Sequence, residues 1–378
     1  MISPLTKVKE EIKKTPPAGG LDAVLISSVS NITYLTNYSG FSKEEREAYL
    51  LIIKNKQYIL SDGRYSEAVK KLIPNFKLIE ISSKNPFEKA LKNLIKKHEI
   101  KKLGFEGHDI TFSEHKKLLN GFDDSNHRSF DFLRSVKTSD EISAIEKACE
   151  LGDKTFAYIL KKIKLGVSEK EIVNEIVFFI KKNGGDISFN PIVAFGPNSA
   201  IPHHVPTHNS KLLTHNSIIL LDFGVKLNNY CSDMTRTIFF GKPSTEQKRM
   251  YETVLEAQQK AIQQFSNLTM QQSKIKASEI DKIACDYIIS KGYPTIPHGL
   301  GHGIGIDVHE APRLSPKSKD VLKQGMVFSI EPGIYLPAEA SAKEGIPAGG
   351  VRIEDLVVLE KSGLRILTQS FRHLLTIK

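Results

Sequence analysis

The chain has 378 residues, of which 40% are hydrophobic and 25% are charged, so it can bury a substantial core and corresponds to about two domains. The formal net charge is +10, but the lysines are scattered along helical patterns and no nucleic-acid-binding motif accompanies them, which favours a solvated basic surface. Examples are Lys89, Lys92, Lys96 and Lys97. No apolar run approaches the ~20 residues that span a bilayer, and the first residues lack the apolar core of a signal peptide. The three cysteines are odd in number and far apart, so no disulfide framework is implied. We expect a cytoplasmic protein without nucleic-acid or membrane partners.

The first third of the chain alternates between short apolar runs and helical spacing. Predicted strands cover 23–26, 49–53, 57–60 and 103–106, and predicted helices cover 64–72, 86–98 and a segment that Ser113 opens. The second and third strands resemble a hairpin, and the alternation as a whole favours a smaller, mostly parallel α/β domain. No glycine-rich phosphate-binding turn follows a strand, so we assign no nucleotide site.

The pattern changes near residue 135, where we place the boundary between domains 1–135 and 136–378. Thr138 can cap a long helix, and its apolar stripe consists of Ile142, Ile145, Cys149 and Phe156. Ser168 with Glu171 is a capping box for the next helix, which we expect to end near residue 182. An apolar segment follows at 189–195, and two further helices begin near Ser244 and Ser278. This mixed order predicts an α+β domain with a curved antiparallel sheet.

Two aspartates lie on a predicted hairpin of the second domain. Residues 218–224 form an apolar strand that carries Asp222, and Asn228-Asn229 is a plausible two-residue turn. With that turn Asp222 faces Thr235, and Asp222 and Asp233 point the same way as diagonal neighbours. The apolar surroundings of Asp222 argue against two unrelated surface aspartates.

Two glutamates lie in similar apolar settings, Glu331 at the end of a predicted strand at 326–331 and Glu354 within another at 351–359. Carboxylates buried without a partner are costly. Four of them together would carry a formal charge of about −4, which two divalent cations neutralise with room for one hydroxide, whereas one cation would leave about −2. The sequence therefore favours a pair of metals.

The run 298–313 holds four glycines and three histidines. Glycine at this density indicates positive φ or close approach of backbones, and His302 would add a neutral ligand to the carboxylates. Oxygen ligands without a thiolate argue for Mn²⁺, Co²⁺ or Fe²⁺ over a structural zinc. The inferred chemistry is hydrolysis of an acyl or a phosphoryl bond, and spacing alone does not choose between them.

In order and local context, the five candidate ligands resemble those of the pita-bread metallopeptidases, the superfamily of aminopeptidase P, prolidase, methionine aminopeptidase and creatinase. The motifs that carry the resemblance lie at 196–203, 298–305, 308–313, 330–335 and 351–355. Weaker motifs at 31–36 and 61–65 resemble the creatinase-type N-terminal domain. The two-domain length is similar to aminopeptidase P and prolidase. Creatinase and the chromatin-associated relatives lose ligands, and none is missing here.

The resemblance implies a role for each site residue. The implied metal ligands are Asp222, Asp233, His302, Glu331 and Glu354. Asp233 and Glu354 would bridge the two metals, and Glu331 would also relay the proton of the attacking water. On the substrate side, His309 would stabilise the oxyanion, His203 would position the substrate, Arg313 would hold a substrate carboxylate or carbonyl, and His298 would line the pocket.

The resemblance also implies the activity: a Xaa-Pro aminopeptidase acting on proline-containing peptides. The alternatives are a Xaa-Pro dipeptidase (prolidase) and, more remotely, a non-catalytic peptide-binding homologue. Mn²⁺ is the first candidate metal, followed by Co²⁺, Fe²⁺ and Zn²⁺, and a homodimer is expected by resemblance alone.

Other residues near these motifs receive less specific interpretations. His204, His208 and His215 are expected to be polar loop residues near the mouth of a cleft. Arg352 either balances charge near the carboxylates or forms a surface pair. Cys231 shares the face of Asp233, and we interpret it as a core residue.

Overall fold

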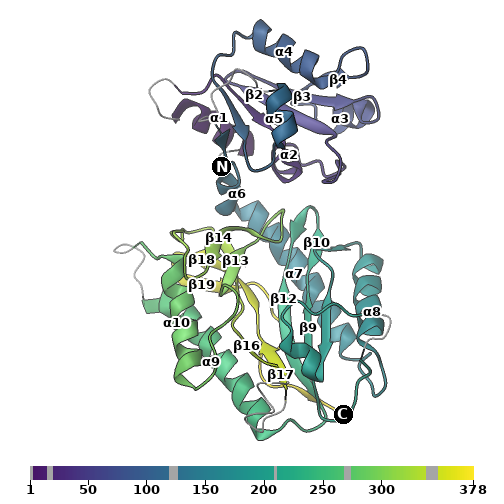
Figure 1. The fold of residues 1–378 in the computed structure, drawn as a ribbon, viewed down its shortest axis with the longest axis vertical. Helices are drawn as coiled ribbons and strands as arrows, with labels where there is room; N and C mark the ends of the chain where they lie inside the picture. The colour runs from purple at the N-terminus through teal and green to yellow at the C-terminus, as the bar shows by residue number, and fades with distance from the viewer. Residues whose placement is uncertain (1–2, 15–19, 119–126, 208–210, 268–273, 338–347) are drawn as a thin grey trace. The chain divides into compact units, whose positions relative to one another are not determined.

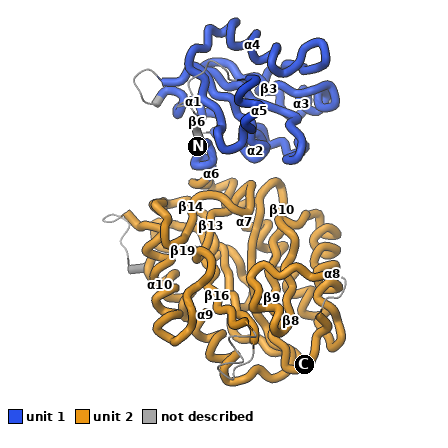
Figure 2. The backbone as a smooth tube through the Cα atoms, in the orientation of Figure 1, with its two compact units in different colours: residues 1–134 blue, residues 135–378 orange. Residues whose placement is uncertain are grey.

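The computed structural model describes residues 3–14, 20–118, 127–207, 211–267, 274–337 and 348–378. The chain divides into two compact units, residues 1–134 and 135–378 (Figure 2). Within the described residues, no helix combines the length and apolarity that a membrane crossing requires.

Unit 1 contains a six-stranded sheet in the order β4-β3-β2-β1-β5-β6 (Figure 1). Its strands are β1 (Ala23–Ile26), β2 (Ala48–Ile53), β3 (Lys56–Asp62), β4 (Lys77–Ile81), β5 (Leu103–Glu106) and β6 (His127–Arg128). The predicted hairpin is β2–β3, and β1 also pairs antiparallel with β2. The other three pairings are parallel. The sheet is therefore mixed, with the predicted parallel character outside the β1–β2–β3 meander.

The helices of unit 1 alternate along the chain with the strands of its sheet. They are α1 (Pro4–Lys14), α2 (Val29–Thr36), α3 (Ser66–Leu72), α4 (Phe87–Lys97), α5 (Phe112–Leu118) and α6 (Phe132–Ser135), which ends at the first residue of unit 2. In α4, Ala90, Leu91 and Leu94 are buried in the core against the sheet, as helical spacing requires. The α4 lysines named above are exposed. The basic face of this helix is therefore a solvated surface.

Unit 2 contains four long helices, α7 (Ser139–Ile159), α8 (Glu169–Lys182), α9 (Thr245–Asn267) and α10 (Ala277–Ser290). Thr138 and Ser168 cap α7 and α8 with complete capping boxes. Both predicted helix starts are thereby confirmed, because the capping side chains satisfy backbone N–H groups that the first turn leaves unpaired.

The strands of unit 2 form several small sheets. They are β7 (Asp186–Ile187), β8 (Ile192–Phe195), β9 (Ser217–Phe223), β10 (Val225–Leu227), β11 (Tyr230–Cys231), β12 (Met234–Phe240), β13 (Gly301–Gly303), β14 (Glu310–Leu314), β15 (Val327–Ile330), β16 (Gly333–Leu336), β17 (Gly349–Arg352), β18 (Asp355–Glu360), β19 (Gly363–Ile366) and β20 (Thr376–Ile377). Their pairings are antiparallel except for β12–β20. The predicted α+β domain with antiparallel sheets is confirmed.

Two helix pairs cover the sheets of unit 2 (Figure 1). One core joins α7 and α8 to β8, β9 and β12. A second core joins α9 and α10 to the strands that follow residue 300. The side chains of the candidate site come from the strands of these sheets and from the short connections between them.

Candidate metal centre

The hairpin that carries the two aspartates has the predicted register. Thr235 is the partner of Asp222 in the β9–β12 pair, and Leu227 is the partner of Tyr230 beside the turn. The turn residues Asn228 and Asn229 have φ angles of 49° and 72°, as a two-residue hairpin of this type requires. Asp222 and Asp233 both line one pocket.

The two glutamates lie where the chain passes from one sheet to another. Glu331 follows β15 and precedes β16, and Glu354 lies between β17 and β18. The prediction of one strand over 351–359 was therefore wrong. Apolar side chains continue through the crossing, so their pattern does not reveal it. Ile330 is the partner of Asp355. Glu331 directly follows Ile330 and Glu354 directly precedes Asp355, so both glutamates lie at the same end of that ladder.

His302 lies on β13, where glycines allow close packing of backbones. A Cβ atom on Gly301 would lie 2.0 Å from the Ser329 carbonyl oxygen, and one on Gly303 would lie 2.2 Å from that of Ala311. Close approach, rather than positive φ, explains these glycines. It places His302 Nε2 3.4 Å from Glu331 Oε1 and 3.7 Å from Asp233 Oδ2.

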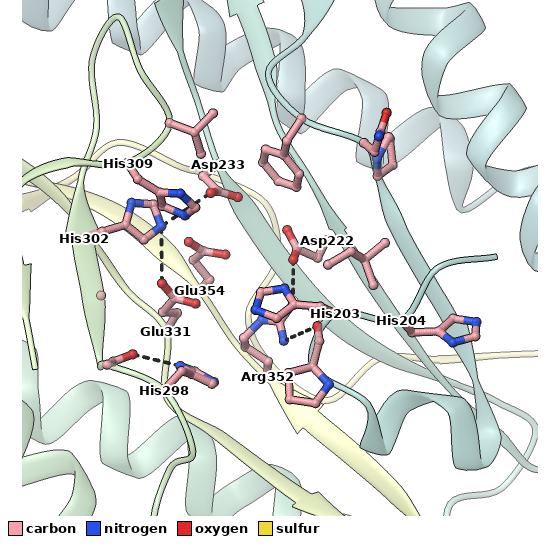
Figure 3. Close-up of a pocket in the computed structure, with 18 of the residues that line it drawn as sticks. His203, His204, Asp222, Asp233, His298, His302, His309, Glu331, Arg352 and Glu354 are labelled. Atoms are coloured by element: carbon pink, nitrogen blue, oxygen red, sulfur yellow. Dashed lines mark hydrogen bonds and ion pairs between the residues drawn. The ribbon is translucent and has the colours of Figure 1, made fainter. Parts of the chain in front are cut away.

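The second ring nitrogen of His302 is held by the backbone. Nδ1 lies 3.1 Å from the Gly303 carbonyl oxygen, which accepts its hydrogen and leaves the Nε2 lone pair directed at the carboxylates. Figure 3 shows His302, Asp233, Glu331 and Glu354 converging on one point of the pocket.

Several carboxylate oxygens in the pocket lack a hydrogen-bond donor among the described residues. Asp222 Oδ1, Asp233 Oδ1 and Glu354 Oε1 are buried and accept no hydrogen bond from any described residue. Ligand atoms of Asp233, His302 and Glu354 all lie within 4.8 Å of one another. Buried acceptors without donors cost about 1–3 kcal/mol each. Oxygen atoms together with one imidazole suit a divalent cation, so the residues present fit a metal.

Burial and mutual repulsion shift the ionisation of this cluster. Burial, reinforced by the neighbouring carboxylates, raises the pKa of Asp233 and of Glu354 well above the usual range. Burial also raises the pKa of Glu331 and lowers that of His302. Without a cation, the carboxyl groups of the cluster therefore keep their protons to a higher pH than isolated carboxyl groups do.

Arg352 completes the electrostatics of the site. Its buried guanidinium donates from Nη2 to Asp222 Oδ2 at 2.5 Å and from Nη1 to Tyr335 Oη at 2.8 Å. Thr235 links it to the cluster, because Thr235 Oγ1 accepts from Arg352 Nε and donates to Glu354 Oε2. Arg352 therefore balances charge and does not form a surface pair. Its charge reduces the formal total of the four carboxylates to about −3, so two divalent cations and one hydroxide leave the site neutral.

The remaining lining of the pocket carries imidazoles (Figure 3) and one further arginine, Arg313. The His309 ring lies edge-on to that of His302 with 4.3 Å between centroids, and burial together with neighbouring positive groups lowers the pKa of His309 to about 4. Nε2 of His298 lies 2.8 Å from Tyr335 Oη, and burial lowers the His298 pKa. Both rings are neutral at neutral pH.

The matches to family models decide the classification. Residues 143–361 match the model of metallopeptidase family M24, and residues 10–136 match that of the creatinase/prolidase N-terminal domain. The chain is a member of metallopeptidase family M24. It is an enzyme of the metallopeptidase class with a creatinase-type N-terminal domain.

Relatives of this M24 metallopeptidase match it along nearly its whole length. The uncharacterized peptidase YqhT of Bacillus subtilis is 34% identical over 95% of this chain and 96% of its own. Among solved structures, the Xaa-Pro dipeptidase from Bacillus anthracis has a TM-score of 0.85 at 32% identity, covering 99% of this chain and 100% of its own. The X-Pro aminopeptidase from Thermotoga maritima has a TM-score of 0.80 at 30% identity, covering 94% and 98%.

A single pocket of about 700 Å³ in the M24 domain brings together the residues singled out from the sequence. Its lining includes His203, Asp222, Asp233, His298, His302, His309, Arg313, Glu331, Arg352 and Glu354. Their roles in binding and catalysis are taken up below as proposals.

The histidines and the cysteine that received less specific interpretations from the sequence lie in different surroundings. His204 lies at the pocket wall and contacts the buried Glu169, so it is more than a solvated loop residue. His215 packs against Phe240, Cys231 is buried in the core, and His208 lies outside the described residues.

Sequence reasoning missed three polar residues that organise the site: Thr235, Tyr335 and Glu169. Tyr335 ends the matched motif 330–335, which was the available signal. Thr235 was identified only as the partner of Asp222, and nothing local singled out Glu169.

Proposed function

We propose that the chain is a Xaa-Pro aminopeptidase that removes the first residue of peptides with proline second, using two divalent cations. The observation that carries the proposal is the convergence of four carboxylates and His302 with three buried oxygens left without donors. The names of the similar structures support proline specificity. Mn²⁺ is the first candidate metal, since the donor set is rich in oxygen.

The proposed metal ligands are Asp222, Asp233, His302, Glu331 and Glu354. Bound there, two divalent cations would lower the pKa of a water molecule and polarise the scissile carbonyl. Glu331 Oε would accept the proton of the attacking water and deliver it to the nitrogen of the leaving proline. Ser329 donates a hydrogen bond to Glu331 Oε1 at 3.1 Å and so orients this carboxylate.

The proposed substrate contacts come from the other residues that line the pocket. His309 remains uncharged above pH ~4, so its N–H can stabilise the developing oxyanion without bringing a cation beside the metals. His203 would position the peptide, and His298, held by Tyr335, would line the proline pocket. Arg313 would bind a carbonyl or carboxylate further along the substrate.

The two arginines that line the pocket favour an aminopeptidase over a dipeptidase. An enzyme that requires a dipeptide must recognise the free carboxylate after proline. Arg352 is engaged with Asp222 and Tyr335, and Arg313 is exposed. The described lining residues therefore include no buried lysine or arginine that is available to bind the free carboxylate of a dipeptide. The dipeptidase remains the second candidate, because Arg313 can reach a short substrate and several similar structures are dipeptidases or prolidases by name.

The deciding experiment compares Ala-Pro-Ala with Ala-Pro after loading the protein with Mn²⁺, Co²⁺, Fe²⁺ or Zn²⁺. We expect higher kcat/KM for the tripeptide and no cleavage of the control Ala-Ala-Ala. Cleavage of Ala-Pro alone would establish the dipeptidase. A fully loaded protein that cleaves neither would support the non-catalytic alternative, which the complete ligand set speaks against.

We further propose a cytoplasmic homodimer. The location is supported by three free cysteines, two of them buried, as expected in a reducing compartment. Light scattering at several concentrations tests the dimer, and a mass corresponding to one chain would contradict it.

A further inference from the structure

The loop that carries His203 is fixed by a buried carboxylate outside the metal pocket. Glu169, the first residue of α8, has no exposed surface. Its Oε1 accepts hydrogen bonds from the Phe195 backbone N–H at 2.7 Å and from Asn198 Nδ2 at 2.8 Å. Its Oε2 lies 3.0 Å from His204 Nε2.

The three partners of the Glu169 carboxylate named above belong to residues 195–204, the segment that leads from β8 to His203. None of these hydrogen bonds is needed to begin α8, because Ser168 and Glu171 already form its capping box. A buried carboxylate is costly unless several donors compensate it. Here the donors that compensate Glu169 belong to a loop, so their hydrogen bonds hold that loop in place and do not stabilise the helix that carries Glu169.

The same loop is held from the opposite side by β17. Ser199 belongs to the short 3₁₀ helix η2 (Gly196–Ala200). Its Oγ accepts a hydrogen bond from the Gly350 N–H of β17 at 2.8 Å. Arg352 Nη1 donates to the Pro202 carbonyl oxygen at 3.4 Å. His203 therefore lies between Pro202, held by Arg352, and His204, held by Glu169.

The His203 side chain itself is exposed in the open pocket. Figure 3 shows its ring beside Asp222 and Arg352, while the neighbouring His204 ring points away from the metal ligands. Packing does little to hold an exposed imidazole, so the position of the backbone on both sides sets the region of the pocket that the ring can reach.

We propose that Glu169 is a positioning residue that acts through His204 and Asn198 to hold His203 toward the substrate. This inference rests on the proposed function, because His203 is there assigned to substrate positioning. Misplacement of a substrate-positioning group by about 1 Å can reduce the rate by about 100-fold. Glu169 makes no contact with the metal ligands among its hydrogen bonds, so metal content is not expected to change.

The test compares Glu169→Ala with Glu171→Ala, a matched control in the same helical turn. The Glu171 side chain is exposed and accepts its hydrogen bonds from Ser168, so its loss weakens the helix start without removing a contact to the loop. We expect Glu169→Ala to reduce kcat/KM on Ala-Pro-Ala by at least about tenfold, with unchanged metal content, and Glu171→Ala to change it by less than about twofold. Glu169→Gln keeps one acceptor oxygen and should recover most of the activity.

A double-mutant cycle with His203→Ala separates positioning from general destabilisation. If Glu169 acts through His203, Glu169→Ala should lower activity by less than about twofold in the His203→Ala background. Equal losses in both backgrounds would overturn the proposal, as would an unchanged kcat/KM in a folded Glu169→Ala protein. Should that variant not fold, His204→Ala removes one contact of the network and enters the same cycle.

Hydrogen exchange gives a measurement that does not depend on the substrate. The Phe195 amide should exchange faster in the Glu169 variant than in the Glu171 variant. Unchanged exchange would overturn the anchoring role even if the enzyme is active. If the loaded wild-type protein cleaves no Xaa-Pro peptide but the exchange difference is found, the proposed function fails while the anchoring of the loop stands.

Discussion

Two carboxylate clusters of the molecule differ in how their oxygens are satisfied. The N-terminal cluster consists of Glu106, His108 and Asp131, and its ligand atoms lie within 4.8 Å of one another, as do those of Asp233, His302 and Glu354 in the metal pocket. Spacing alone does not distinguish the two clusters. They differ in whether hydrogen-bond donors reach the carboxylate oxygens.

Every carboxylate oxygen of the N-terminal cluster has a donor. Glu106 Oε2 accepts the N–H groups of Ser27 and Ser28, and Oε1 accepts Asn31 Nδ2. Asp131 Oδ1 accepts from the same Asn31 amide and Oδ2 accepts from Ser129 Oγ. In the metal pocket, three buried oxygens have no donor among the described residues. The first arrangement ties α2 to β5, and the second leaves acceptors that a cation can satisfy.

The largest expected effect is in the metal pocket. Asp233→Ala removes an acceptor from the centre of the cluster, so it should lower kcat/KM by at least about 1,000-fold and reduce bound metal, measured by mass spectrometry of the loaded protein. Asp131→Ala, the matched change in the N-terminal cluster, should leave the metal content unchanged. An active Asp233→Ala enzyme, or loss of metal from Asp131→Ala, would remove the distinction between the clusters.

A smaller effect is expected beside the metal ligands. His309→Ala should lower kcat by about 100- to 1,000-fold, the effect of removing an oxyanion donor, while metal content stays the same. Steady-state kinetics and metal analysis on one preparation check this. Loss of metal in proportion to activity would show that His309 supports the ligands and not the substrate.

Metal removal should produce a pH-dependent loss of stability. The raised pKa values of Asp233, Glu331 and Glu354 mean that the folded metal-free state holds protons that the unfolded state releases above pH ~4. The stability of the metal-free protein therefore falls as pH rises from that value through the raised pKa values. Metal binding must displace these protons, so its stabilising effect should increase with pH.

Thermal unfolding with and without a chelator tests this at pH 5.5 and pH 8. We expect the metal to raise Tm by about 5 °C or more at pH 8 and by less at pH 5.5. An equal or larger rise at pH 5.5 would contradict the proton displacement.

The smallest effect is expected in the N-terminal cluster. Glu106→Gln replaces an acceptor oxygen by a donor and leaves some of the surrounding N–H groups unpaired, at a cost of about 1–3 kcal/mol in the free energy of unfolding. Denaturant unfolding measures the loss, and metal content should not change. A stabilised variant would show that the buried carboxylate is not held by its donors.

Much of the local structure was predictable because it depends on neighbouring residues. The helix starts at Thr138 and Ser168 follow from capping boxes. The register of the aspartate hairpin follows from a two-residue turn and the period of a strand. The strand predicted over 351–359 was wrong, because its apolar pattern continues while the chain changes sheet.

The sequence by itself singled out the five candidate ligands, the aspartate hairpin and the helix starts, since spacing, capping and turn chemistry act over a few residues. Only the tertiary structure decided which polar groups complete the site. Arg352 reaches Asp222 across 130 positions, and Glu169 reaches Phe195 and His204 across 26 and 35. Such distant partners decide whether a buried carboxylate accepts hydrogen bonds or is left free to bind a metal. Each hydrogen bond requires two atoms within about 3 Å, and the local sequence pattern does not encode that proximity.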